Sequence, residues 1–252
     1  MAMAHRRIGT GPVRVVVLHD WFGTSANWGS VLDHLDPREF SYAFLDYRGY
    51  GDRRDVTGRY DLAEIADDVL ALADELGWDT FSLLGHSMGG KAVQQVLVRA
   101  PERVEKLIGI NPVPAGPYAM DEPTRALFYG AAEDAGNRRA ILDLVTGRRA
   151  SPYWLDRMVE HSLAVSRPEA FAAYLASWQP LDLSAAVKGS TVPVLVLVGA
   201  YDLAITADVM RATWQVWYPD CRVQPLPGAG HYPPHEAPVA FATEVEAFLR
   251  TR

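Results

Sequence analysis

Short apolar runs alternate with longer segments of helical periodicity along most of the chain. Most of these runs are too uniformly apolar to leave one side for water, which is typical of strands in a parallel sheet covered on both faces. The expected strands are VRVVVLH (13–19), SYAFLDY (41–47), TFSLLGH (80–86), VEKLIGIN (104–111), VPVLVLVGA (192–200) and CRVQPLP (221–227). Apolar residues at helical spacing predict helices over Leu62–Leu76 and Ala92–Ala100. This order of strands and helices predicts an α/β fold.

One long interval interrupts the alternation. From about Pro114 to Ser184 the chain has helical patterns and no strand pattern, and the cluster NPVPAGP marks its start. The helical patterns are TRALFYGAAEDA (124–135), RRAILDLVTG (138–147), PYWLDRMVEHSLAV (152–165) and RPEAFAAYLASWQ (167–179). We therefore expect a core domain of residues 1–114 and 185–252, interrupted by a helical cap (lid) domain of residues 115–184.

The composition excludes several classes of partner. The 252 residues are 49% hydrophobic with a formal net charge of −7, so a polyanion would be repelled and a nucleic-acid partner is not expected. The longest apolar runs fall far below the roughly 20 residues needed to cross a bilayer, and the start, MAMAHRRIGTGP, lacks the apolar stretch of a secretion signal. Cys221, the one cysteine, cannot form an internal disulfide. We expect a cytoplasmic monomer or homodimer with no membrane partner.

The stretch LLGHSMGGK (83–91) carries the first chemical signal. It places Gly85-x-Ser87-x-Gly89 after a predicted strand and before a predicted helix, which is the context of a nucleophile elbow. The turn is so sharp that a Cβ at either glycine would meet neighbouring backbone, and the serine is held in a strained conformation at the carboxyl end of the sheet. The alternative is a glycine-rich turn with an incidental serine, because the motif alone also arises by chance.

A serine hydroxyl becomes a nucleophile when a base takes its proton, so a histidine must lie nearby in the fold. His231 is the predicted base because it follows the last strand in GAGHYPPHEAP, a loop whose glycines permit an unusual path. His235 is the rival, but it lies near a helix start and is interpreted as a surface histidine. Four further histidines are interpreted as surface or packing residues, with His5 in a frayed start: His5, His34, His86 and His161.

The histidine in turn needs a carboxylate to orient it. Asp202 follows the apolar strand in VLVLVGAYD, at the sheet edge expected to hold Ser87 and His231. An acid after the preceding strand is excluded because Asn111 stands there. Asp208 and Asp220 are interpreted as solvated or capping residues. The chain order serine, aspartate, histidine is that of α/β-hydrolases.

The chain resembles the α/β-hydrolase superfamily through GHSMGGKAV, GAYD, GAGHYPPHEAP and the loop DYRGYG (46–51), and the resemblance covers nearly the whole chain. GHSMGGKAV in particular is similar to a branch of small bacterial carboxylesterases. The resemblance implies an α/β-hydrolase fold, with a mostly parallel central sheet, helices on both faces and an inserted helical cap. It also implies a leading β-hairpin, which must be shortened or absent here because about a dozen residues precede the first strong strand.

The activity implied is hydrolysis of carboxylic esters through an acyl-enzyme, without cofactor or metal. Backbone N–H groups of Met88 and of Trp21, with Phe22 next, are expected to form the oxyanion hole. Some aromatic residues should line a pocket for a small to medium apolar or aromatic ester. The expected substrate-binding residues are Phe22, Phe128, Trp154, Trp178 and Tyr232. Lactones stay open as substrates, as do three alternative functions: a cofactor-free haloperoxidase, a carbon–carbon bond hydrolase and a ligand-sensing receptor.

Asp20 in LHDWFGTS departs from the superfamily pattern, which usually has glycine after the histidine. Aspartate is among the few other residues that tolerate a left-handed backbone. A carboxylate aimed at the oxyanion hole would repel the developing negative charge. We therefore expect Asp20 to turn inward and to accept loop N–H groups or to pair with a cation such as Arg48. The alternative is that Asp20 faces the pocket and selects charged or hydroxylated substrates.

Overall fold

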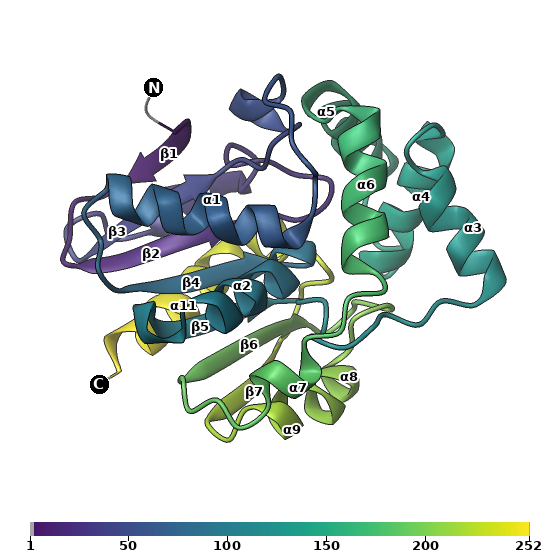
Figure 1. Cartoon of the computed structure of the whole chain (residues 1–252). Coiled ribbons are helices and arrows are strands. Elements are labelled where there is room, and N and C mark those ends of the chain that lie inside the picture. Colours follow the sequence, from purple (N-terminus) through teal and green to yellow (C-terminus); the bar gives the residue numbers. More distant parts are fainter. Residues whose placement is uncertain (1–2, 252) are drawn as a thin grey trace.

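One seven-stranded sheet runs through the protein in the computed structural model, which describes residues 3–251 (Figure 1). The strand order is β1-β3-β2-β4-β5-β6-β7, in which β1 is antiparallel to β3 and every other neighbouring pair is parallel. The strands are β1 (His5–Ile8), β2 (Val13–Leu18), β3 (Phe40–Leu45), β4 (Phe81–His86), β5 (Val104–Ile110), β6 (Val194–Gly199) and β7 (Cys221–Leu226). The mostly parallel sheet predicted from the apolar runs is confirmed.

β1 is the strand that the sequence pattern did not predict. His5, interpreted above as part of a frayed start, instead lies in this edge strand and pairs with Leu45. Every side chain of His5–Ile8 is exposed or half-buried, so the segment lacks the apolar run that marks most of the other strands. A single short strand therefore stands where a leading hairpin was implied, and it pairs with β3 rather than with β2.

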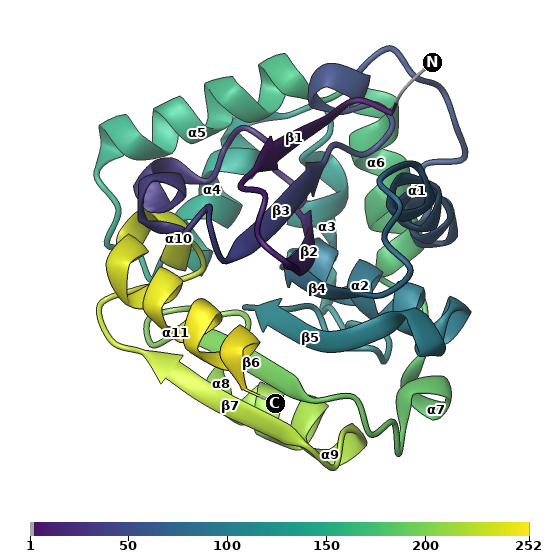
Figure 2. The ribbon, with the colours of Figure 1, turned by 90° about the vertical axis from the view of Figure 1, so that its left-hand side faces the viewer.

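Helices cover both faces of the sheet. Successive residues of a strand point to opposite faces, so each buried strand places apolar side chains against the helices on both sides. In β2, Val16 and Leu18 join the apolar cluster of α1 and α2, whereas Val15 and Val17 pack with α11 and the 3₁₀ helix Gly29–His34. Figures 1 and 2 show α1 and α2 on one side of the sheet and α11 on the other. The α-helices outside residues 115–183, the shorter ones included, are α1 (Leu62–Glu75), α2 (Met88–Arg99), α7 (Ser184–Val187), α8 (Ala207–Ala212), α9 (Trp214–Trp217), α10 (Pro233–Glu236) and α11 (Pro238–Arg250).

Of the five α-helices between β5 and β6, the first four lie beside one end of the sheet in Figure 1. They are α3 (Glu122–Gly130), α4 (Ala135–Val145), α5 (Pro152–Val165) and α6 (Pro168–Trp178). Asp121, Asp134 and Ser151 each accept a backbone N–H in the first turn of α3, α4 and α5. Arg138 of α4 is buried, and its guanidinium carbon lies 3.7 Å from the centre of the Phe171 ring of α6. The helical periodicity of this segment is therefore realised as four packed helices.

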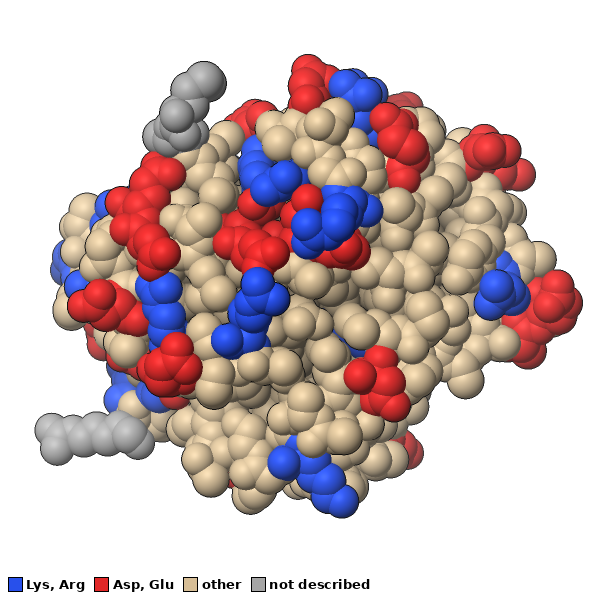
Figure 3. Space-filling model, in the orientation of Figure 1, with Lys and Arg blue, Asp and Glu red and all other residues tan. Residues whose placement is uncertain are grey.

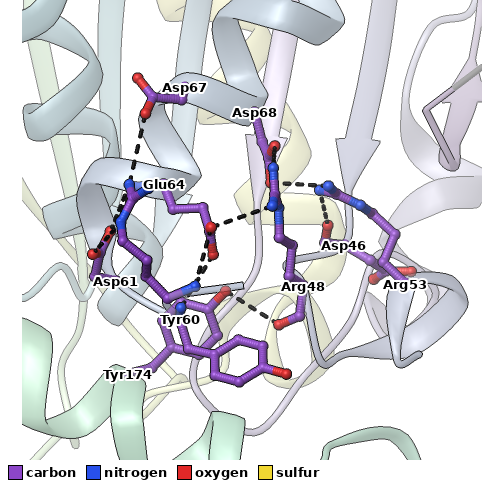
Figure 4. Close-up of polar contacts among 10 residues, drawn as sticks. Asp46, Arg48, Arg53, Tyr60, Asp61, Glu64, Asp67, Asp68 and Tyr174 are labelled. Atoms are coloured by element: carbon purple, nitrogen blue, oxygen red, sulfur yellow. Dashed lines mark hydrogen bonds and ion pairs between the residues drawn. The ribbon is translucent and has the colours of Figure 1, made fainter. Parts of the chain in front are cut away.

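A charged cluster fixes the loop that follows β3 (Figure 4). Arg48 donates to the two carboxylate oxygens of Asp68 at 3.0 and 2.8 Å and lies 3.3 Å from Glu64, both on α1. Arg53 pairs with Asp68 at 2.9 Å, and the Tyr174 hydroxyl of α6 donates to the Arg48 carbonyl at 3.2 Å. The cluster therefore connects this loop to α1 and α6, and it binds the Arg48 guanidinium to α1.

Charged side chains of both signs are interspersed on the surface. Figure 3 shows Lys and Arg beside Asp and Glu over α1, where the ion pairs Arg59–Asp67 and Arg99–Asp67 lie. These pairs are exposed, so each contributes little to stability. Across residues 3–251, none of the helices is both long enough and apolar enough to cross a membrane.

Candidate active site

Ser87 lies in the sharp turn between β4 and α2. Its backbone has φ 54° and ψ −114°, a strained conformation for a residue with a side chain. A Cβ at Gly85 would collide with the Gly89 carbonyl, and one at Gly89 would lie 2.6 Å from the Leu18 carbonyl oxygen. The two glycines therefore permit the turn, as expected from the sequence, and the Ser87 side chain borders a cavity.

His231 and Asp202 meet although they come from different loops. His231 Nδ1 lies 2.6 Å from Asp202 Oδ2, and both side chains are buried. Asp202 Oδ1 also accepts the N–H groups of Ala204 and Ile205 at 2.8 and 3.0 Å. Since the carboxylate is an acceptor, Nδ1 carries the proton of this contact and Nε2 is left to accept one.

Asn111 supports this pair, and sequence reasoning missed it as a functional residue. Its side-chain amide donates to Asp202 Oδ2 at 2.7 Å and its amide oxygen accepts the Gly199 N–H at 3.1 Å. Asn111 occupies the position after β5 where a catalytic acid could otherwise stand. It instead orients Asp202, the acid that follows β6. Its place directly after β5 was the signal that could have identified it.

The electrostatic environment of His231 favours its protonated form. Burial by itself lowers the pKa of the imidazole, but the charge and the hydrogen bond of Asp202 outweigh burial and raise that pKa above its ordinary value. His231 is buried, and it borders the same cavity as Ser87. This arrangement can take up a proton and hold the resulting charge.

Two backbone N–H groups are available near Ser87. The Trp21 N–H has no hydrogen-bond partner among residues 3–251, and the Met88 N–H belongs to the first turn of α2, where N–H groups lack a partner within the helix. The Phe22 N–H, the second choice from the sequence, instead donates to Asp20 Oδ1 at 2.6 Å. The Trp21 loop is held by its indole, which donates to the Phe171 carbonyl at 2.8 Å. Trp21 and Met88 therefore stay the candidates for an oxyanion hole.

An apolar cavity lies between the strand ends and α3, α4 and α6. Its lining residues are Trp21, Phe22, Ser87, Val113, Tyr118, Phe128, Ile141, Val145, Trp178, Ala204, Ile205, His231 and Tyr232. Four of the five expected substrate-binding residues are thus on its wall, whereas Trp154 lies over a separate groove beside His235 and Glu236. The sequence missed Ile141 and Val145, whose spacing of four residues on α4 places them on one face.

Asp20 turns inward, as expected, but its partner is not Arg48. Asp20 is buried and accepts the Phe22 N–H, and its Oδ2 lies 3.3 Å from Nδ1 of His86. His86 is buried as well, and its Nε2 lies 2.7 Å from the His231 carbonyl oxygen. The Arg48 guanidinium instead pairs with carboxylates of α1, which the sequence pattern could not show. His86, interpreted as packing, makes two polar contacts at the centre of the site.

The rival base does not reach the acid. His235 Nε2 lies 3.2 Å from the Asn27 carbonyl, and its ring packs near Trp154 and Tyr232. Burial lowers the pKa of His235. Across residues 3–251, no group of three or more His, Cys, Asp or Glu side chains is arranged to hold a metal ion.

Known proteins resemble this chain in sequence and in fold. The model of the alpha/beta hydrolase fold family matches residues 13–238. The chain is 29% identical over 254 residues to the pimeloyl-[acyl-carrier protein] methyl ester esterase of Pectobacterium carotovorum, with 96% of both chains covered. It is 31% identical over 253 residues to the dihydrolipoyllysine-residue acetyltransferase component of an acetoin cleaving system of Pseudomonas putida, covering 96% of this chain and 65% of that one. A solved thermophilic esterase from Thermogutta terrifontis has a TM-score of 0.84 at 25% identity, covering 98% of this chain and 92% of that one.

Proposed function

Because this chain belongs to the α/β-hydrolase fold family, we propose that it is a serine hydrolase that cleaves carboxylic esters through an acyl-enzyme. The proposal rests above all on the 2.6 Å contact between His231 and Asp202, at the wall of the cavity that Ser87 also borders. A nucleophile, a base and an orienting acid on three loops are what ester hydrolysis needs. Relatives named as esterases support the same reaction class.

In the proposed first half-reaction, Ser87 Oγ attacks the ester carbonyl while His231 Nε2 accepts its proton. Asp202 keeps the imidazole in the required tautomer and stabilises the imidazolium that forms. The Trp21 and Met88 N–H groups donate to the developing oxyanion, and one such donor typically contributes about 100-fold to 1000-fold in rate. His231 then gives its proton to the leaving alcohol as the carbon–oxygen bond breaks.

In the second half-reaction, water replaces the alcohol. His231 takes a proton from the water as its oxygen attacks the acyl carbonyl, and the same two N–H groups hold the second oxyanion. The ester bond to Ser87 Oγ then breaks, and His231 returns the proton to the serine. The carboxylic acid leaves, and the enzyme is restored.

We assign the acyl or alcohol part of the substrate to the apolar cavity. Its wall is mostly aromatic and aliphatic, so a neutral ester of small to medium size with an apolar or aromatic group is the proposed substrate. Phe128, Ile141 and Val145 reach this wall from α3 and α4. We therefore propose that residues 115–184 form a cap on a core of residues 1–114 and 185–252, and that the cap selects substrates.

The test is turnover of a p-nitrophenyl ester series from acetate to decanoate, run beside γ-lactones and δ-lactones. Ester turnover together with covalent labelling of Ser87 by a fluorophosphonate, located by peptide mass spectrometry, is the expected result. Unlabelled Ser87 and no turnover would overturn the proposal. Halide oxidation with acetate and hydrogen peroxide, cleavage of a vinylogous diketone, or a melting shift with a terpenoid butenolide without turnover would point instead to the three alternatives.

A further inference from the structure

His86 lies between two groups that can only accept hydrogen bonds. Its Nε2 is 2.7 Å from the His231 carbonyl oxygen, and its Nδ1 is 3.3 Å from Asp20 Oδ2. Both His86 and Asp20 are almost completely buried, with exposed fractions of 3% and 4%. The imidazole therefore bridges the Asp20 carboxylate and the backbone of the His231 loop.

Several contacts favour the carboxylate form of Asp20. Asp20 Oδ1 accepts the Phe22 N–H at 2.6 Å, which stabilises a carboxylate. Burial by itself raises the pKa of Asp20, but the contact with His86 outweighs burial and holds that pKa below its usual range. His19 adds in the same direction, and the nearby Tyr232 phenol has its pKa raised by burial and by Asp20. Asp20 is therefore assigned as a carboxylate.

Asp20 and His86 contact both the loop of the proposed oxyanion donor Trp21 and the loop of the proposed base His231. Through Oδ1, Asp20 holds the Phe22 N–H, next to the proposed oxyanion donor Trp21. Through His86, it holds the carbonyl of His231, the proposed base. His86 itself directly precedes Ser87. The His231 backbone otherwise meets α4, where its N–H donates to the Val145 carbonyl at 3.1 Å.

We propose that Asp20 and His86 form a buried bridge that positions the loop of Trp21 and Phe22 (the oxyanion loop) and the His231 loop relative to Ser87. The two residues are positioning residues, because neither borders the cavity in which the substrate is placed. The proposal rests on the proposed ester hydrolysis for its kinetic consequence, but the bridge itself does not depend on that function. A shift of about 1 Å in a reacting group can cost about 100-fold in rate, so loose positioning should reduce kcat.

The first test is spectroscopic and uses the unaltered protein. With ¹⁵N-labelled histidine, Nε2 of His86 should carry a proton that exchanges slowly with water, because this nitrogen donates to the buried His231 carbonyl. In Asp20→Asn, the Nδ1 resonance of His86 should shift, because the charge of its neighbour is lost. An Nε2 without a proton, or an Nδ1 resonance that Asp20→Asn leaves in place, would overturn the bridge, whether or not the protein hydrolyses esters.

The second test is kinetic and compares variants on p-nitrophenyl acetate, with rates per fluorophosphonate-titrated active site. His86→Phe keeps a ring but loses both contacts, and we expect kcat to fall about 100-fold with KM within about threefold. His86→Gln can still donate to the His231 carbonyl, so it should recover most of that loss. Asp20→Asn combined with His86→Phe should cost no more than His86→Phe alone, because the two residues act as one unit.

Asp46→Asn is the matched control, since Asp46 is also a buried carboxylate near these loops. It accepts the N–H groups of Ser25 and Asp52 at 2.6 and 2.9 Å and contacts neither His86 nor His231. Its replacement should lower the melting temperature while kcat per titrated site stays within about threefold. Unchanged kcat in His86→Phe, equal kcat losses in Asp46→Asn and Asp20→Asn, or multiplied losses in the double variant would refute a positioning role.

Discussion

Ser87 is the residue on which the proposed reaction depends most directly. Its replacement by alanine removes the covalent path and leaves only binding and oxyanion stabilisation, so kcat on an accepted ester should fall by about 10⁴-fold or more. His231→Ala should cause a comparable loss, because His231 is the proposed base and borders the same cavity as Ser87. The measurement is kcat on p-nitrophenyl esters for each purified variant.

His235→Ala is the control for this experiment. His235 contacts the Asn27 carbonyl and not Asp202, so its loss should change kcat by no more than about threefold once the folded fraction is accounted for. Similar losses at His231 and His235, or near-normal activity of Ser87→Ala, would show that the base or the nucleophile is assigned incorrectly.

The raised pKa of His231 sets how kcat/KM depends on pH. His231 must be neutral to accept a proton, and Asp202 raises its pKa above the ordinary 6.5 despite the opposing effect of burial. kcat/KM should therefore climb with pH and level off above that raised pKa. Asp202→Asn should move this rise in kcat/KM to lower pH, because the burial of His231 stays while the charge of Asp202 is lost. It should also lower the plateau value of kcat/KM by about 10⁴-fold. A rise at the same pH in both proteins would contradict the assignment of His231 and Asp202 as base and acid.

The same titration contributes to folding stability. The folded-state pKa of His231 is raised, so the contribution is fully present below the unfolded value near 6.5 and is lost as pH rises through the folded pKa. Chemical denaturation across this range should show the loss in the unaltered protein and a smaller one in Asp202→Asn. An equal pH dependence of the unfolding free energy in both proteins would mean that other groups dominate this dependence.

At the scale of elements, Lys91 of α2 joins the two connections of the helical segment. Its ammonium donates to the carbonyls of Gly116, before α3, and of Trp178 and Leu181, at the end of α6 and beyond it, at 2.5–2.8 Å. Burial lowers the pKa of Lys91 to about 8, so the ammonium is still the main form at neutral pH. One side chain, one turn after Ser87, therefore holds both ends of the proposed cap.

Lys91→Met should loosen these connections, because the apolar side chain leaves buried carbonyls without a donor, at a cost of about 1–3 kcal/mol. Amide exchange should speed up at Tyr118 and Leu183, whose N–H groups bond to Gln179 and Ala115 across the two connections. Lys106→Met is the matched control, since Lys106 donates to the Phe248 and Leu249 carbonyls at the far end of α11. The same exchange pattern in both variants would show a general loss of stability instead of a local clamp.

For the whole molecule, the proposed cap should control which esters are accepted. Trp178 borders the cavity and Trp154 does not, although the sequence suggested both. Trp178→Ala should shift the preferred acyl length towards longer chains while kcat on the acetate changes little, because the added space is apolar. Trp154→Ala is the control and should keep the original profile. Uniform losses over all lengths in Trp178→Ala would mean that this residue only maintains the fold.

The strands and helices were predicted correctly where burial gives them a strong apolar pattern, and were missed where this pattern is weak. β6 is buried at every position, so its apolar run identified it. β1 is an exposed edge strand, and its four residues show no such run. The predicted start at Ala92 missed the first turn of α2, because Gly89 and Gly90 are poor helix formers that the close backbone packing requires.

The sequence by itself determined the alternation of strands and helices and the positions of Ser87, Asp202 and His231 after their strands, because local periodicity and turn chemistry are written in consecutive residues. Only the tertiary structure decided which strand ends are neighbours. The register of β2 beside β4, with Leu18 opposite Gly85, brings Asp20 next to His86. Asn111 likewise meets Asp202 because β5 lies beside β6. These contacts join residues far apart in the chain, and their energy depends on the sheet order, which no local pattern contains.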